Sequence, residues 1–90
     1  MAESSTRRTT ETRWDRALDC RGLLCPMPIV HTGRVIKEPQ PGQVLRVVTT
    51  DRGAIADMPA FAEDTGNSLL EWHQDGSDLV FYIRKEAQPG

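Results

Sequence analysis

The chain has 90 residues, of which 38% are hydrophobic and 27% charged, a composition typical of one small soluble domain rather than of two domains or a disordered chain. Its 11 Lys and Arg against 13 Asp and Glu leave a formal net charge of −2, which excludes nucleic-acid binding through phosphate neutralisation alone. No apolar run approaches the roughly 18 residues of a membrane span, and no apolar secretory signal opens the chain. We therefore expect a cytoplasmic protein without membrane contact.

Both ends of the chain are expected to lie outside the fold. Residues 1–14 are polar and show no periodic apolar spacing before Trp14, which predicts a flexible tail, and residues 87–90 predict a frayed C-terminus. Residues 15–86 are then expected to form a single domain.

The first half of this domain predicts a strand, a helix and a second strand. In residues 16–20 alternation places Leu18 and Cys20 on one face, and a helix is predicted from Pro26 because proline is favourable at the first helical position. Its inner face at helical spacing consists of Ile29, Thr32, Val35 and Ile36. Prolines 39 and 41 with Gly42 end it, and the β-branched run over residues 43–49 predicts an interior strand.

The second half predicts another helix and a hairpin. Asp51 is expected to cap a helix over residues 52–64, in which Pro59 predicts a kink or a short first turn before it. The inward positions of this helix are Ile55, Met58 and Ala62, and Gly66 with Asn67 ends it. Runs over residues 68–73 and 78–84, separated by a turn containing Asp-Gly, predict two strands. In these strands the shared faces are Leu70 with Trp72, and Leu79 with Phe81 and Ile83.

The order βαβαββ predicts an α/β fold, because a strand, a crossover helix and a strand form a right-handed parallel pair. Both helices then lie on one face of the sheet, as in a two-layer sandwich. They also begin at the same sheet edge, so Cys25 is expected to neighbour Asp51 and Arg52.

Cys25 is the candidate reactive residue. At the N-cap of the first helix, the partial positive charge of the peptides favours a thiolate, so we expect a thiol pKa below the ordinary value of about 8.5. Pro26 and Pro28 at helix positions one and three leave only the N–H groups of Met27 and Ile29 to face an anion. An exposed, ionisable thiol without its own acid and base suits exchange of sulfur between proteins.

The stretch Leu18-Asp19-Cys20-Arg21-Gly22-Leu23-Leu24-Cys25-Pro26-Met27-Pro28 resembles the signature of the TusA/SirA family of small sulfur carriers, whose hallmark is Cys-Pro-Xaa-Pro. The similarity covers about residues 17–85 and includes Thr32, Arg34, Pro41-Gly42, Asp51, Asp57-Met58-Pro59, Phe61, Gly66 and Ile83-Arg84-Lys85.

The resemblance implies a four-stranded mixed sheet and a cysteine, here Cys25, that receives sulfane sulfur as a persulfide and passes it on. The process it implies is tRNA thiolation, sulfur oxidation or related sulfur transfer. It further implies a sulfur-donor protein, either a cysteine desulfurase or a rhodanese-like sulfurtransferase, and a sulfur-acceptor protein. We expect a monomer with no cofactor, no metal and no direct nucleic-acid contact.

Several residues are expected to support Cys25. Arg52 should lie near the thiol and stabilise the anionic sulfur, partly offset by Asp51. The partner's docking surface is expected to include Arg21, Met27, Arg52 and Met58. Met27 is expected to be exposed, unless it folds back onto Leu23 or Leu24. The candidate site thus consists of Cys25 with Pro26, Pro28, Arg21, Met27, Asp51 and Arg52.

Two other functions stay open: a non-catalytic regulatory or interaction module on the same fold, and a thiol redox protein that uses Cys20 and Cys25. Alternation favours a buried Cys20 facing the helices. His31 and His73 lack metal-ligand spacing with the cysteines, so zinc is not expected. Trp14 and Trp72 are expected to close the core and cover the sheet. The carboxylates Glu63, Asp64, Asp75 and Asp78 lie at helix ends and turns, where no general acid–base pair is expected.

Overall fold

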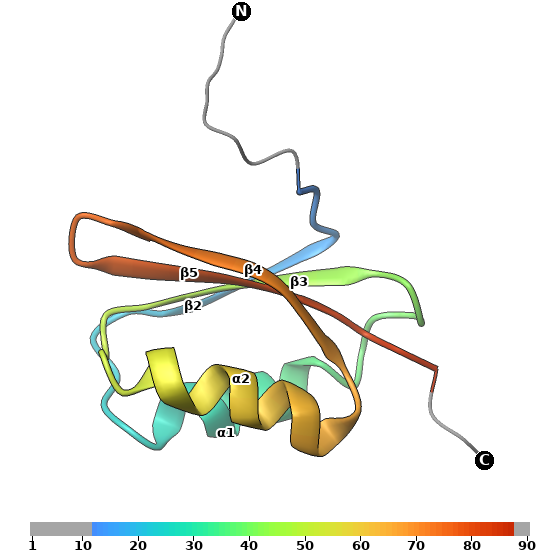
Figure 1. Ribbon diagram of the computed structural model, residues 1–90, viewed down its shortest axis with the longest axis horizontal. Coiled ribbons are helices and arrows are strands. Elements are labelled where there is room, and N and C mark those ends of the chain that lie inside the picture. Colours follow the sequence, from blue (N-terminus) through green and yellow to red (C-terminus); the bar gives the residue numbers. More distant parts are fainter. Residues whose placement is uncertain (1–11, 88–90) are drawn as a thin grey trace, which may run out of the picture.

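The computed structural model describes residues 12–87, in which two helices cover one face of a four-stranded sheet (Figure 1). The elements are β2 (Arg16–Cys20), α1 (Met27–Val35), β3 (Val44–Thr49), α2 (Ala54–Thr65), β4 (Ser68–Asp75) and β5 (Asp78–Arg84). The strand order is β2-β3-β5-β4; β2 and β3 are parallel, and β5 is antiparallel to both its neighbours. The predicted βαβαββ order, mixed sheet and two-layer arrangement are confirmed.

The main core lies between the sheet and the helices. Alternate residues of β2 and β5 face the helices, which confirms the faces predicted for these two strands. β3 lies between β2 and β5, which confirms that it is an interior strand. The buried members of this core are Cys20, Ile36, Leu45, Val47, Ala54, Met58, Leu79, Phe81 and Ile83. Thr32 of α1 is also fully buried, and its hydroxyl donates to the Pro28 carbonyl at 2.7 Å. Burial of this face holds both helices against the sheet.

β4 departs from the predicted pattern because its register shifts between Leu69 and Glu71. Leu70 is the extra residue of this bulge and is 39% exposed, whereas Leu69 packs against the core. Trp72 stacks on Phe81 with their ring centroids 5.7 Å apart. The prediction that Leu70 and Trp72 share a face is therefore wrong.

The hairpin turn between β4 and β5 is also tighter than predicted. β4 continues to Asp75, and Gly76 and Ser77 alone connect it to β5. Gly76 has φ +62°, the left-handed conformation that two-residue hairpin turns favour.

α2 begins two residues later than predicted. Gly53 is its N-cap and no side chain caps the helix. The Asp51 carboxylate accepts the Gly53 N–H at 3.4 Å, which is not a helix-capping bond. The predicted Asp51 cap is therefore wrong. The helix is continuous through Pro59 and ends, as predicted, at Gly66 with φ +74°. The following Asn67 N–H bonds back to the last turn, which satisfies a carbonyl at the helix end.

The sheet face away from the helices carries a smaller apolar cluster, formed by Val44, Val48, Val80 and Tyr82. Trp14 covers this face: its ring centroid lies 5.9 Å from that of Tyr82, and the Arg46 guanidinium lies 5.0 Å from the Trp14 ring centre. Residues 1–11 of the expected tail and residues 88–90 lie outside the described residues. Neither helix within residues 12–87 has the length and apolar character needed to cross a membrane.

Candidate functional site

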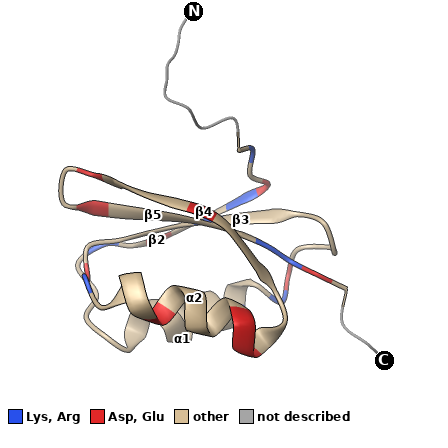
Figure 2. Cartoon of the chain, viewed as in Figure 1, with Lys and Arg blue, Asp and Glu red and all other residues tan. Residues whose placement is uncertain are grey.

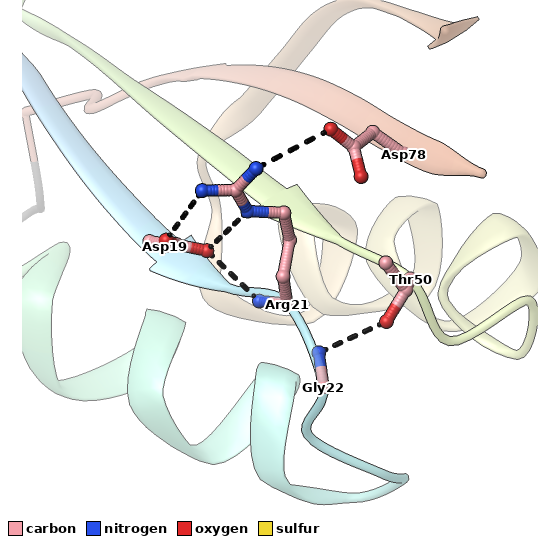
Figure 3. A network of polar contacts seen from close by, with 5 residues as sticks. All are labelled: Asp19, Arg21, Gly22, Thr50 and Asp78. Carbon is pink, nitrogen blue, oxygen red and sulfur yellow. Dashed lines mark hydrogen bonds and ion pairs between the residues drawn. The ribbon is translucent and has the colours of Figure 1, made fainter. Parts of the chain in front are cut away.

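The loops that follow β2 and β3 meet at one edge of the sheet. The Gly22 N–H donates to Oγ1 of Thr50 at 2.9 Å, which joins the loop before α1 to the loop before α2 (Figure 3). Gly22 has φ +81°, a conformation that favours glycine and lets the chain turn towards α1. Both helices consequently begin at this edge, as the sequence predicts.

Cys25 lies in the turn that leads into α1, and its side chain is exposed. Pro26 is the N-cap and Met27 the first helical residue, so Pro28 occupies the second helical position. The predicted helix start is one residue early, and Cys25 precedes the N-cap rather than forming it. The fixed φ angles of the two prolines and the burial of Pro28 still make this turn stiff.

The backbone N–H groups at the start of α1 are used within the chain. The Met27 N–H donates to the Leu24 carbonyl at 2.8 Å, and the Ile29 N–H donates to the Pro26 carbonyl at 3.1 Å. Pro28 has no N–H. The prediction that Met27 and Ile29 present their N–H groups to an anion is therefore wrong. Because the positive end of a helix resides in its unsatisfied N–H groups, this helix gives little support to a thiolate.

The Cys25 thiol instead contacts a carboxylate of the other helix. Its Sγ donates a hydrogen bond to Oδ2 of Asp57, in the first turn of α2, over 3.6 Å. Partial desolvation is the largest factor that raises the pKa of the Cys25 thiol, followed by the charge and hydrogen bond of Asp57 and the charge of Asp51. The predicted lowering of the thiol pKa is wrong, because desolvation and two carboxylates outweigh the helix N-terminus.

The two arginines of the expected site do not contact the thiol. Arg21 binds the Asp19 carboxylate at 2.9 and 3.0 Å and lies 3.7 Å from Asp78, on the sheet face away from α1 (Figure 3). Arg52 is exposed, and its charge is not among those that shift the pKa of Cys25. The structure therefore removes Arg21 from the surroundings of the thiol, and stabilisation of the sulfur by Arg52 stays a prediction.

Apolar side chains next to the thiol are exposed. Leu24 is 74% exposed and Met27 is 39% exposed, as expected for Met27. Met58, which the sequence placed within reach of a partner, is fully buried in the core and does not reach the surface. Exposed apolar side chains beside an exposed thiol favour contact with a protein over capture of a small substrate.

Cys20 is buried, as predicted, with 1% of its surface exposed. Both cysteines are free thiols. Burial first, and then the charge of Asp19, raises the pKa of the Cys20 thiol. In residues 12–87 no group of three or more His, Cys, Asp or Glu side chains is arranged to hold a metal ion.

Asp57 and Leu24 are the site residues that sequence reasoning missed. The signal for Asp57 was present, since it lies in the first turn of a helix that begins at the same edge as the Cys25 turn. Asp57 directly precedes the inward-facing Met58, and this position indicates the flank of the helix rather than a contact with Cys25. Leu24 carried no signal, because an apolar residue between a strand and a helix is usually assigned to the core.

The comparisons with known proteins agree with this geometry. The family model described as "Sulfurtransferase TusA" matches residues 16–85. The putative sulfur carrier protein YrkI of Bacillus subtilis is 45% identical over 71 residues, which cover 79% of this chain and 95% of that protein. The sulfur carrier protein TusA of Allochromatium vinosum is 42% identical over 72 residues, with 80% and 95% covered.

Solved structures show the same fold. The crystal structure of a SirA-like protein from Desulfitobacterium hafniense has a TM-score of 0.70 at 19% identity and covers 81% of this chain and 100% of that one. The solution structure of a Helicobacter pylori protein has a TM-score of 0.66 at 24% identity, with 79% and 97% covered. At these identities the likeness to solved structures supports the fold alone. The family model and the curated relatives, in contrast, match nearly all of the folded part of this chain and establish its family. The chain therefore belongs to the TusA family of sulfur carrier proteins.

Proposed function

We propose that this protein carries sulfane sulfur as a persulfide on Cys25, receives it from a donor protein and passes it to an acceptor protein. The observation that carries the proposal is the exposure of Cys25 on a stiff turn, while the other cysteine of the chain is buried. The names of its relatives as sulfur carriers support the same function. A cysteine desulfurase or a rhodanese-like sulfurtransferase is the kind of donor that this chemistry requires, and one copy of the chain is sufficient.

The transfer consists of two exchange steps. In the first, the Cys25 thiolate attacks the terminal sulfur of the donor's persulfide, a new S–S bond forms on Cys25, and the donor cysteine leaves as a thiolate that takes up a proton. In the second, a nucleophile of the acceptor attacks the terminal sulfur, and Cys25 returns to the thiol. Each step exchanges one S–S bond for another bond to the same sulfur, so loading requires no added oxidant or reductant.

Intact-protein mass spectrometry tests the proposal. After incubation with a cysteine desulfurase and L-cysteine, the protein should gain one sulfur atom that a reductant removes. Cys25→Ser should show no gain. Cys20→Ala is the matched control and should load like the unchanged protein, because Cys20 is buried. No gain by the unchanged protein from either the desulfurase or polysulfide would contradict the proposal and favour an interaction module.

The same measurement separates the redox alternative. A protein that pairs Cys20 with Cys25 would lose two hydrogen atoms on oxidation, and both cysteine variants would lose the reaction equally. Burial of Cys20 and exposure of Cys25 favour independent thiols over such a pair.

A further inference from the structure

Within residues 12–87, no ion pair neutralises the carboxylates near Cys25. On the other faces, arginines pair with the four carboxylates Asp19, Asp78, Glu38 and Glu86. Asp51, Asp57 and Asp64 form no ion pair within the described residues. Figure 2 shows acidic residues in both the first and the last turn of α2. The surface beside the thiol therefore carries negative charge that this part of the chain does not neutralise.

The two nearest carboxylates flank the start of α2. A Cβ atom built on Gly53 would lie 3.3 Å from Oδ2 of Asp51 and 3.7 Å from Oδ2 of Asp57, so both carboxylates surround this point. The first turn of α1 contributes no acidic residue, and its basic residue, Arg34, lies in the last turn. Arg52, in the loop before α2, is placed to offset the charge of Asp51 and Asp57. It forms no ion pair in residues 12–87.

The acidic surface continues away from the thiol along α2. An open groove of about 290 Å³ between the helices is lined by Ile29, Asp57, Ala60, Phe61 and Asp64. Asp57 therefore touches the thiol on one side and the groove on the other. With Leu24 exposed next to Cys25, this surface combines an apolar contact with negative charge, which complements a partner surface of Lys and Arg around an apolar recess.

We propose that Asp57 restrains the Cys25 thiol in the free protein and is the docking contact for a cationic surface of the sulfur-donor protein, so that pairing of Asp57 with the donor releases the thiol for reaction. This inference rests on the proposed function. It assigns Asp57 as a positioning residue and the acidic groove of Asp57 and Asp64 as the donor's binding surface.

The restraint is electrostatic. A carboxylate that accepts the thiol hydrogen bond and carries negative charge disfavours the thiolate, in keeping with the raised pKa of Cys25. When a donor's Lys or Arg pairs with Asp57, that charge is offset and the thiol loses its acceptor. The proton then leaves Cys25 and the donor's departing thiolate takes one up, so the net reaction of thiol and persulfide conserves protons and electrons.

Asp57→Asn tests the inference because it should speed the reaction of Cys25 with small molecules and slow its loading by a donor protein. Loss of the charge should speed alkylation of Cys25 by iodoacetamide at neutral pH by about three- to tenfold, the range expected for one charge close by in a largely aqueous setting, and lower its pH midpoint. Loading by polysulfide should also become faster. Loading by a cysteine desulfurase with L-cysteine should instead become several-fold slower, because the docking contact is lost.

Two further variants separate docking from acidity. Asp64→Asn lies on the groove without contacting the thiol, so it should slow desulfurase loading and leave alkylation unchanged. Asp75→Asn, at the exposed end of the β4–β5 hairpin, should change neither rate. Added salt should slow desulfurase loading of the unchanged protein more than that of Asp64→Asn.

An unchanged pH midpoint of alkylation in Asp57→Asn would overturn the restraint. Faster desulfurase loading in Asp57→Asn, in parallel with polysulfide loading, would overturn the docking contact. If the unchanged protein takes up no sulfur at all, the proposed function fails, whereas the alkylation measurement still decides whether Asp57 restrains the thiol.

Discussion

Met58→Ala is expected to lower stability strongly, because this side chain has no exposed surface and packs in the core with residues of β3 and β5. Truncation of a buried Met to Ala costs about 2–5 kcal/mol, from lost apolar burial and from the cavity that remains. A domain of this size has a total stability of about 5–15 kcal/mol, so the variant should still fold. Since each kcal/mol shifts the melting temperature of a small domain by about 4–8 °C, a fall of at least about 8 °C is expected in a thermal unfolding experiment.

Met27→Ala makes the same chemical change at an exposed position and is the matched control. With 39% of its surface exposed, Met27 should contribute no more than about 0.5 kcal/mol to stability. Its removal should instead slow loading by a desulfurase several-fold, while Met58→Ala, measured well below its melting temperature, should load normally. Equal destabilisation by the two variants would refute the assignment and indicate that Met27 folds back onto Leu23 or Leu24.

Two further predictions concern the sheet edge. The hydrogen bonds from Arg21 are the main cause that holds the pKa of Asp19 at about 2 instead of 3.8. A carboxyl with a lowered folded pKa stabilises the fold above its unfolded pKa and loses that contribution as pH falls towards 2, so the unchanged protein should lose more melting temperature over this range than Asp19→Asn. Because the pair is exposed, the difference should be small. Thr50→Val removes the acceptor of the Gly22 N–H, so it should cost about 1 kcal/mol in unfolding experiments and speed hydrogen exchange of the Gly22 amide.

Periodicity predicted most of the fold because burial acts on whole faces. Leu18 and Cys20 alternate in β2, and Leu79, Phe81 and Ile83 alternate in β5, and each set lies in or against the main core. Periodicity failed at Leu70, which was predicted to share a face with Trp72, because strand pairing and not hydrophobicity sets its position. Leu69 and Leu70 have the same hydrophobicity, and only the pairing of β4 with β5 decides which of them is the extra residue of the bulge.

The site was less predictable because its electrostatics depend on contacts between elements. The sequence identified Cys25 and the sheet edge on which it lies, and the stiff turn of Pro26 and Pro28 followed from local chemistry. It could not indicate that carbonyls of the same turn use the N–H groups of Met27 and Ile29. The helix dipole and the nearby carboxylate both act over a few ångströms. A helix that starts one residue later than predicted therefore changes which of the two dominates the pKa of the Cys25 thiol.

An exposed thiol with the proposed carrier role faces two opposing demands. It must react as a thiolate with its partners, yet an exposed thiolate is also the form that oxidants attack. The Cys25 side chain is exposed to small molecules, so protection has to come from its protonation state. The hydrogen bond to Asp57 favours the protonated thiol, which is the less reactive form. Under the proposed docking, the same carboxylate is neutralised when a cationic donor binds, so reactivity rises where a protein supplies the sulfur and stays low towards small oxidants. A single residue that both restrains the thiol and recognises the partner meets both demands without an enclosed active site.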